Sequence, residues 1–336
     1  MESVQNTDAS PEKLPLLSVV FSLRNEEDVL HELFSRLYKT LDQLKLRYEL
    51  VFVNDDSTDR TLEILKEHAA KDPRVKIINT SRRFGVIRCF LAGFRYARGD
   101  ALVYMDADLQ DPPELIATLV EKWREGADVV HTTRTKRLGE SPMKMWLTRQ
   151  AYRIINFVAD IKIPIDTGNF KLLTRRVVEQ ILSIGEQEPF LRGLVVWVGF
   201  KQVYVPYERQ PRYSGETHYP LFGSINPTRS FVTGVISFSS APLYFALVMG
   251  LMVSAGSFFY LVFVVVTRLL YGWHQPGWPA MMVTMLFLGG TILFTIGVLG
   301  LYVGKIYNHI KGRPLVVIES TVGVEDGFRI EPRPGP

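Results

Sequence analysis

The sequence predicts an α/β domain with a mainly parallel sheet, followed by a two-helix transmembrane hairpin. One observation is the alternation of apolar runs with helical patterns between residues 16 and 215. Another is a pair of long apolar segments near the C-terminus, and a third is a set of polar clusters that follow the apolar runs. Ligands of parallel α/β sheets bind outside the carboxyl ends of the strands, so the polar clusters mark the expected site.

Short apolar runs predict the strands, and helical patterns lie between them. The predicted strands are Leu16–Leu23, Glu49–Val53, Val75–Ile78, Ala101–Met105 and Val129–Thr132. The predicted helices are Glu27–Leu44, Ser57–Ala70, Val86–Tyr96 and Pro112–Trp123. This alternation is typical of a parallel sheet that helices cover on both faces.

Two apolar segments account for the predicted hairpin. Pro242–Thr267 and Trp278–Val303 each exceed the roughly 20 residues that span the hydrocarbon core of a bilayer. With histidine counted as neutral, Arg268 is the only charged residue between Arg229 and Lys305. A helix that is apolar on all sides over such a length is expected to cross a membrane.

The charges beside the two segments predict the orientation of the hairpin. Lys305, Lys311 and Arg313 follow the second segment, whereas the connecting loop Arg268–Gly277 carries only Arg268. Positive charge gathers on the cytoplasmic side of membrane helices, so the α/β domain and both termini are expected in the cytoplasm.

Composition excludes two classes of protein. The 336 residues include 39 basic and 35 acidic side chains, and a net charge of +4 without a basic stripe argues against a nucleic-acid partner. Cys89 is the one cysteine, which excludes an internal disulfide framework and predicts a thiol in the core. The polar N-terminus is unlike a signal peptide.

Three polar clusters follow three of the predicted strands. They are Asn25-Glu26-Glu27, Asn54-Asp55-Asp56 and Asp106-Ala107-Asp108. Taken singly, each cluster is explained by a solvated turn or a helix cap, and we keep that interpretation for Glu27 and Asp56. Taken together at one edge of a sheet, they predict an acidic crevice that suits a nucleotide base or a sugar.

Asp106 and Asp108 predict a metal site. Alternate residues at the end of a strand point to the same side, and two carboxylates on one side repel each other unless a cation or a basic partner lies between them. Mg²⁺ takes one or two protein carboxylates and completes its shell with water and phosphate oxygens. The chain lacks zinc-ligand spacing, a Walker loop and a G-x-G-x-x-G run, so the pair indicates a nucleotide diphosphate whose leaving group the metal neutralises.

Asp111 is predicted to cap the start of a helix. Pro112 follows it and Glu114 lies three residues on, which is the pattern of a capping box at the start of a helix. Loss of such a cap costs about 1 kcal/mol.

Six runs resemble family 2 glycosyltransferases in their order along the chain: VFVNDDSTDRTLEIL, YMDADLQDPPELI, TRTKR, DTGNFKLLTRRVV, LVVWVGFKQ and RQPRYSGETHYPL. The chain is most similar to the subgroup that transfers a sugar from a nucleotide donor to a polyisoprenyl phosphate. Bactoprenol glucosyltransferases and dolichol-phosphate mannose synthases belong to this subgroup. The resemblance extends from Ser18 to about Arg313 and implies a Rossmann-like GT-A glycosyltransferase domain before the hairpin.

The resemblance also implies roles for individual residues. The metal, Mg²⁺ or Mn²⁺, would be held by Asp106 and Asp108. The nucleotide sugar would be bound by Glu26, Asp55, Asp106 and Gln110. The catalytic group would comprise Asp166, which acts as base or binds the sugar, and Arg134 and Arg137, which face phosphates unless they form a solvated basic turn. The acceptor phosphate would be bound by Arg209, Arg212 and His218.

The implied activity is transfer of a sugar, from a UDP-sugar, to a lipid such as undecaprenyl phosphate with inversion. The enzyme would serve glycosylation of cell-envelope polysaccharide or lipid at the plasma (inner) membrane, and a homo-oligomer is left open. The expected organisation is a polar tail at 1–15, a cytoplasmic GT-A catalytic domain at 16–215, an interfacial amphipathic segment at 216–241, two transmembrane helices within 242–304 and a cytoplasmic tail at 305–336.

Six positions depart from the family pattern: Ser22, Arg24, Arg83, Val86, Asn169 and His218. None of them removes the acidic pair. A processive polysaccharide synthase would need more spans and a Gln-x-x-Arg-Trp segment, and a soluble sugar nucleotidyltransferase would lack the hairpin. The remaining alternative is a membrane-anchored pseudo-glycosyltransferase that only binds partners.

Overall fold

The structure is a computed structural model that describes residues 14–137, 150, 153, 162, 164, 167–210, 235–236, 238–271 and 277–324. The chain divides into two compact units. One unit comprises Met1–Arg149, Ile163–Ser224 and Pro314–Pro336, and it contains the sheet. The other comprises Gln150–Lys162 and Ile225–Arg313, and it contains two long helices.

Eight strands of the described chain form one sheet in the order β7-β5-β6-β4-β1-β2-β3-β8. The strands are β1 (Leu16–Leu23), β2 (Arg47–Asn54), β3 (Val75–Thr80), β4 (Ala101–Asp106), β5 (Val129–Arg137), β6 (Thr167–Thr174), β7 (Gln202–Arg209) and β8 (Ile318–Val322). β1 pairs in parallel with β2 and β4, β2 with β3, and β5 with β7. β6 and β8 run antiparallel to their neighbours. The predicted mainly parallel sheet is confirmed.

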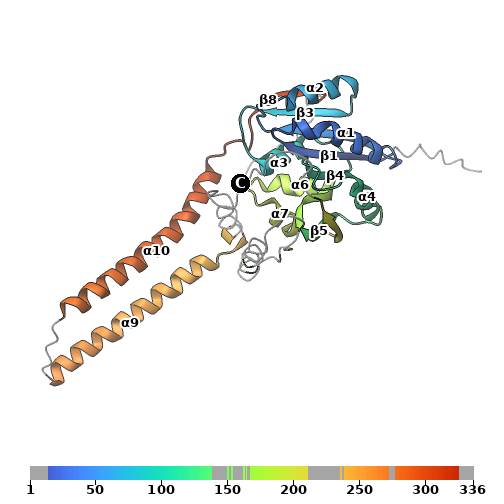
Figure 1. The fold of residues 1–336 in the computed structure, drawn as a ribbon. Coiled ribbons are helices and arrows are strands. Elements are labelled where there is room, and N and C mark those ends of the chain that lie inside the picture. The colour runs from blue at the N-terminus through green and yellow to red at the C-terminus, as the bar shows by residue number, and fades with distance from the viewer. Residues whose placement is uncertain are drawn as a thin grey trace, which may run out of the picture. The chain divides into compact units, whose positions relative to one another are not determined.

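Helices cover both faces of this sheet (Figure 1). One face packs against α1 (Glu27–Leu41), α2 (Thr61–Lys71) and α4 (Ile116–Arg124), which follows the short turn η1 (Pro113–Leu115). The other face packs against α3 (Val86–Tyr96), α6 (Arg175–Ile184) and α7 (Leu191–Trp197). Each face of the sheet therefore borders its own apolar core.

The spacing of apolar residues explains why these helices form where they do. In α1 each successive turn contributes buried residues, namely Leu30, then Leu33 and Phe34, then Leu37, then Leu41, so they form one stripe that faces the sheet.

Close packing of α3 on the sheet depends on a glycine. A Cβ at Gly93 would overlap the Val20 side chain and lie 3.2 Å from Cγ2 of Val53, so only glycine lets the helix approach β1 and β2 this closely. Cys89, on the same helix, is buried and unpaired, as predicted.

The second unit contains α9 (Ala241–Tyr271) and α10 (Trp278–Ile310), which lie side by side (Figure 1). The rings of Phe245 and Phe294 meet edge to face at 6.3 Å, and the Tyr302 hydroxyl donates to the Ser239 carbonyl at 2.8 Å. The start of α9 therefore lies beside the second half of α10, as in a hairpin. Most apolar side chains along both helices are exposed, including Phe259.

The C-terminal segment differs from the predicted tail at 305–336. After α10 the chain buries Leu315 and Val316 in the core beside α3 and then adds β8 to the edge of the sheet, antiparallel to β3. The short polar strand Ile318–Val322 gave no apolar pattern in the sequence. It is an integral part of the α/β domain.

Candidate active site at the carboxyl edge of the sheet

The three polar clusters lie at one edge of the sheet. In the register of β1 with its two neighbours, Leu23 lies beside Asn54 and Ser22 lies beside Asp106. The three strands therefore end at the same level. β5 and β7 run toward this edge and β6 begins at it, which brings further side chains there. We call this the carboxyl edge.

Hydrogen bonds join the loops that follow β1 and β2. Nδ2 of Asn25 donates to the Thr58 hydroxyl at 3.2 Å, and the Thr58 backbone N–H donates to Oδ1 of Asn25 at 2.8 Å. Oδ1 of Asp59 accepts the Thr61 N–H at 3.1 Å. These bonds explain why the helix predicted to begin at Ser57 begins at Thr61.

Glu26 and Glu27 stand at the start of α1. The Glu26 N–H donates to the Thr61 hydroxyl at 2.9 Å, and the Glu26 side chain is buried. Oε2 of Glu27 accepts the Arg60 N–H at 3.0 Å, which agrees with its structural interpretation. The role of Glu26 in nucleotide binding stays a prediction.

Both carboxylate oxygens of Asp55 bind the loop between β3 and α3. Oδ1 accepts the Phe84 N–H at 2.6 Å, and Oδ2 accepts the Gly85 N–H at 2.9 Å. Gly85 has a φ of +94°, a conformation that favours glycine. Asp55 is 3% exposed, and its two hydrogen bonds hold the loop that borders the carboxyl edge. Its contact with a nucleotide base stays a prediction.

Each of the three loops holds one non-glycine residue in the left-handed region. The φ angles are 53° at Asn25, 55° at Asp56 and 57° at Leu109. Asparagine and aspartate tolerate this region, whereas leucine rarely adopts it. Leu109 is buried in the core, so burial of its side chain holds the strained backbone between Asp108 and Gln110.

Asp106 ends β4 and lies among other carboxylates. Burial, together with Asp108 and Asp111, raises the pKa of Asp106 to about 6, although Arg134 and Asn169 act in the opposite direction. The side-chain amide nitrogen of Asn169 lies 3.5 Å from both carboxylate oxygens.

The acidic surplus at Asp106 fits a divalent cation. A cation between Asp106 and Asp108 would relieve the repulsion that helps to raise the Asp106 pKa. Within the described residues, no three His, Cys, Asp or Glu side chains form a metal cluster. Two carboxylates suffice for Mg²⁺, which takes its other ligands from water and phosphate.

The prediction that Asp111 caps a helix is wrong. η1 begins after Pro112, and no side chain caps it. Glu114, the expected capping-box partner, instead binds Arg36 of α1 through both carboxylate oxygens, at 2.8 and 2.6 Å. Asp111 is fully buried, and its Oδ1 accepts a hydrogen bond from the Tyr207 hydroxyl. The local pattern resembles a cap, but a distant strand binds the carboxylate.

Two of the predicted phosphate-binding arginines meet at Asp111. Nη2 of Arg134 lies 3.9 Å from Oδ1 of Asp111, and Nε of Arg209 lies 3.8 Å from the same oxygen. Burial disfavours the charged guanidinium of Arg134, but Asp111, Tyr207 and Asp106 outweigh burial and raise its pKa. Arg134 therefore stays charged near Asp106 and Asp111.

Gln110 ties the loop after β4 to the end of β7. Its carbonyl accepts the Gln210 N–H at 3.1 Å, and its own N–H donates to Oδ1 of Asp108 at 3.2 Å. The predicted contact of its side chain with the nucleotide sugar stays a prediction.

Asp166, Arg212 and His218 lie outside the described residues, as does the side chain of Arg137 in β5. Most of the predicted interfacial segment at 216–241 lies outside them as well.

Tyr207 belongs to this site but was not predicted from the sequence. A tyrosine within the strand sequence QVYVPYER carries no signal of its own, because its hydroxyl meets Asp111 only after β5 and β7 pair. Asn169 had a weak signal, since it departs from the aspartate that is common in the family.

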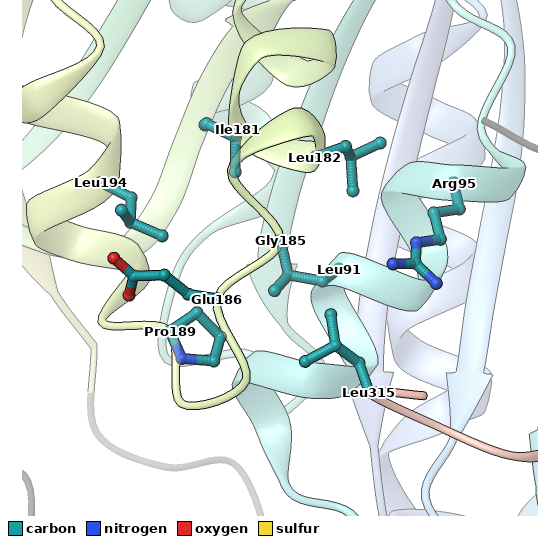
Figure 2. Close-up of a pocket in the computed structure, with 9 residues that line it drawn as sticks. All are labelled: Leu91, Arg95, Ile181, Leu182, Gly185, Glu186, Pro189, Leu194 and Leu315. Atoms are coloured by element: carbon teal, nitrogen blue, oxygen red, sulfur yellow. The ribbon is translucent and has the colours of Figure 1, made fainter. Parts of the chain in front are cut away.

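The pocket in Figure 2 is too small to be the donor site. Its volume is about 10 Å³, which is enough for at most one water molecule. It is lined by Leu91, Arg95, Ile181, Leu182, Gly185, Glu186, Pro189, Leu194 and Leu315. None of these residues belongs to the polar clusters of the carboxyl edge.

Comparison with known proteins gives the family. The family model described as glycosyl transferase family 2 matches residues 18–182. An uncharacterized glycosyltransferase of Bacillus subtilis (strain 168), YkcC, is 45% identical over 309 residues, which cover 92% of this chain and 95% of that protein. The chain belongs to glycosyl transferase family 2.

The chain is also similar to a curated relative over nearly its full length and to a solved structure over part of its length. The SfII prophage-derived bactoprenol glucosyl transferase of Shigella flexneri is 36% identical over 306 residues, or 91% of this chain and 98% of that protein. A solved structure of glucosyl-3-phosphoglycerate synthase from Mycobacterium tuberculosis, in complex with Mn²⁺, uridine diphosphate and phosphoglyceric acid, is 17% identical with a TM-score of 0.46. The match covers 66% of this chain and 78% of that chain.

The predicted resemblance is therefore confirmed. The protein is a family 2 glycosyltransferase with a GT-A-like α/β domain and two long apolar C-terminal helices.

Proposed function

We propose that the protein transfers a sugar from a UDP-sugar to a polyisoprenyl phosphate such as undecaprenyl phosphate, with inversion at the anomeric carbon. The observation that carries this proposal is the carboxyl edge, where Asp106 lies near Asp108 and the partly buried Arg134, and where Arg134 and Arg209 both face Asp111. The printed name of the Shigella flexneri relative, a bactoprenol glucosyl transferase, supports the acceptor class.

The apolar helices support an acceptor that stays in a membrane. Ala241–Thr267 and Met281–Ile310 have mean hydropathies of 2.2 and 2.1, and each is long and apolar enough to cross a bilayer. An isoprenyl tail does not leave the bilayer, so an enzyme that acts on its phosphate must work at the membrane surface. We propose that this hairpin keeps the catalytic domain there.

The donor side of the reaction is assigned to the loops after β1, β2 and β4. A divalent cation, Mg²⁺ or Mn²⁺, held by Asp106 and Asp108 would offset the charge of the departing nucleoside diphosphate. Asn169 orients Asp106 through its amide. The nucleotide would be bound by Glu26, Asp55 and Gln110, with Asp55 acting in part through the loop that it holds.

The acceptor side needs no strong general base. A phosphate monoester is largely dianionic at neutral pH, because its second pKa is about 6. Its oxygen bonds to the anomeric carbon, the bond to the diphosphate oxygen breaks, and the nucleoside diphosphate leaves with the electron pair. Arg134 and Arg209 would offset the charge of the acceptor phosphate, together with Arg137, Arg212 and His218, while Asp166 orients the sugar.

We place the enzyme in the plasma (inner) membrane with its catalytic domain and both termini in the cytoplasm. Lys305, Lys311 and Arg313 favour this orientation. The product would then serve glycosylation of cell-envelope polysaccharide or lipid.

A transfer assay tests the proposal. Membranes that contain the protein are incubated with radiolabelled nucleotide sugars and undecaprenyl phosphate, and the lipid fraction is then examined for label. A labelled, acid-labile lipid that forms with one UDP-sugar is the expected result. A pseudo-glycosyltransferase would give no labelled lipid with any donor, and that outcome would overturn the proposal.

A further inference from the structure

Asp111 links two strands and the loop that carries the acidic pair. It follows β4, whereas Arg134 comes from β5, and Tyr207 and Arg209 come from β7. Its Oδ1 accepts the Tyr207 hydroxyl and faces both guanidinium groups within 4 Å, at 3.9 Å for Arg134 and 3.8 Å for Arg209. Its Oδ2 is buried and has no hydrogen-bond partner among the described residues.

Arg134 is enclosed on several sides. Its Nε donates to the Tyr207 hydroxyl at 3.2 Å, and its side chain is 10% exposed. A Cβ at Gly168, in β6, would lie 2.5 Å from Nη2 and 3.0 Å from Cζ of Arg134. The guanidinium therefore lies directly against the Gly168 backbone, in space that exists only because this residue is glycine.

Asp111, Arg134 and Arg209 together carry one positive charge in surplus. Arg134 and Arg209 both lie within 4 Å of Oδ1 of Asp111, so their charges repel each other. The single carboxylate of Asp111 offsets one of the two charges. Both side chains are long and flexible, so without Asp111 the two cations would separate and lose their fixed direction. Asp106 also acts on Arg134, so this charge suits an anion once a cation offsets Asp106 and Asp108.

We propose that Asp111 is a positioning residue that holds the guanidinium groups of Arg134 and Arg209 side by side for the phosphate of the acceptor. The identity of that phosphate rests on the proposed function. Asp111 is fully buried, so it acts through the two arginines and does not touch the substrate. Cations fixed before the substrate arrives lose less entropy when it binds.

Three variants of the full-length protein separate this role from stability alone. Asp111→Asn keeps the shape and an acceptor for Tyr207 but removes the charge. Tyr207→Phe removes the hydroxyl that binds both Asp111 and Arg134. Gly168→Ala displaces only the end of the flexible Arg134 side chain.

Asp128→Asn is the matched control. Asp128 is also a buried carboxylate that binds an arginine, Arg176, but it precedes β5 at the opposite end of the sheet. Its replacement should lower stability without changing the carboxyl edge.

The first measurement is the rate at which phenylglyoxal modifies Arg134 and Arg209, mapped by mass spectrometry of the detergent-purified protein. Phenylglyoxal reacts with the neutral guanidine. A nearby carboxylate slows this reaction because it favours the charged guanidinium. Asp111→Asn should speed modification of both arginines by about 10-fold, as loss of a charge-assisted contact implies. Gly168→Ala should speed modification of Arg134 alone, Tyr207→Phe should have an intermediate effect, and Asp128→Asn should have none.

The second measurement is the KM for each substrate. Asp111→Asn should raise the KM for undecaprenyl phosphate by about 10-fold and leave the KM for the nucleotide sugar within about 2-fold. Parent-like modification rates in Asp111→Asn would overturn the positioning role. Faster modification with an unchanged acceptor KM would overturn the assignment of the acceptor phosphate to this pair. The modification assay needs no substrate, so it decides the positioning role even if the parent protein transfers no sugar and the proposed function fails.

Discussion

Oε2 of Glu319, in the last strand of the sheet, accepts a hydrogen bond of 2.6 Å from Nδ2 of Asn79 in β3. Nδ2 of Asn54 donates in turn to Oδ1 of Asn79, also at 2.6 Å. Asn54 precedes Asp55, which holds the loop between β3 and α3. The segment that follows the two long helices is therefore joined by side-chain hydrogen bonds to the carboxyl edge.

Replacing Glu319 with alanine should destabilise the domain slightly. The change removes the acceptor for Asn79 at a partly exposed position, so we expect a loss of about 1 kcal/mol in the free energy of unfolding. Ser320→Ala, at the next and also exposed position of β8, is the control. Denaturant unfolding of the two variants gives the comparison, and equal midpoints would mean that the Glu319 bond adds nothing.

Replacing Asp111 with alanine distinguishes the buried cluster from a helix cap. A lost cap would cost about 1 kcal/mol. Removing a carboxylate that faces two largely buried arginines should cost about 3 kcal/mol or more. The free energy of unfolding, measured with denaturant and tryptophan fluorescence, decides between these values. A loss near the lower one would contradict the structure.

The first five strands could be predicted because their apolar runs are nearly continuous. β6 escaped prediction because its sequence TGNFKLLT places Lys171 in the middle of the strand, where that side chain is fully buried. β7 alternates buried and exposed residues and contains Pro206, which suits the sheet edge that it occupies. β8 is short and polar, and only pairing with β3 makes it a strand.

The candidate site could be predicted only in part, for a similar reason. The strand-end clusters around Asp55 and Asp106 are visible in the sequence because parallel strands end at one edge. The arginines came from the family resemblance. Asp111 was misread because its carboxylate binds Tyr207, a residue 96 positions away, and no local pattern reports such a contact.

Lys171 should make stability depend on pH. Burial, with a smaller contribution from Arg192, lowers the pKa of Lys171 to about 7. Lys171 lies between Tyr104 and His131 in the sheet register, and its Nζ has no hydrogen-bond partner in the described chain. An unfolded lysine has a pKa of about 10.4, so between about pH 7 and pH 10 the unfolded state binds more protons than the folded state.

The Lys171→Met variant tests this dependence. In this window Lys171 loses its proton when the protein folds, and the loss of a proton costs less as the pH rises. The free energy of unfolding of the parent should therefore rise by roughly 1.4 kcal/mol per pH unit across that window. The variant should be more stable than the parent, by an amount that is constant below about pH 7 and shrinks toward about pH 10. Lys39→Met, at an exposed position, is the control. A stability difference that stays constant from neutral to alkaline pH would contradict the lowered pKa.

The proposed orientation can be tested with single cysteines, since Cys89 is buried. Trp273→Cys, between the two apolar segments, should react with a membrane-impermeant maleimide in intact cells. Ser320→Cys, in β8, should react only after the cells are permeabilised. Labelling of the second cysteine in intact cells would reverse the orientation that Lys305, Lys311 and Arg313 favour.

We propose that Asp106 and Asp108 support transfer of a sugar to a polyisoprenyl phosphate. The most direct test is the rate of labelled lipid formation by Asp106→Asn, beside Asp56→Asn, which changes an exposed aspartate at the same edge. We expect Asp106→Asn to remain folded and to lose at least about 1000-fold in transfer rate, since the positioning and charge balance of the leaving group are lost. Asp56→Asn should transfer at the parent rate, and a chelator should stop the parent reversibly. Transfer by Asp106→Asn at the rate of Asp56→Asn, undiminished by chelator, would contradict the claim.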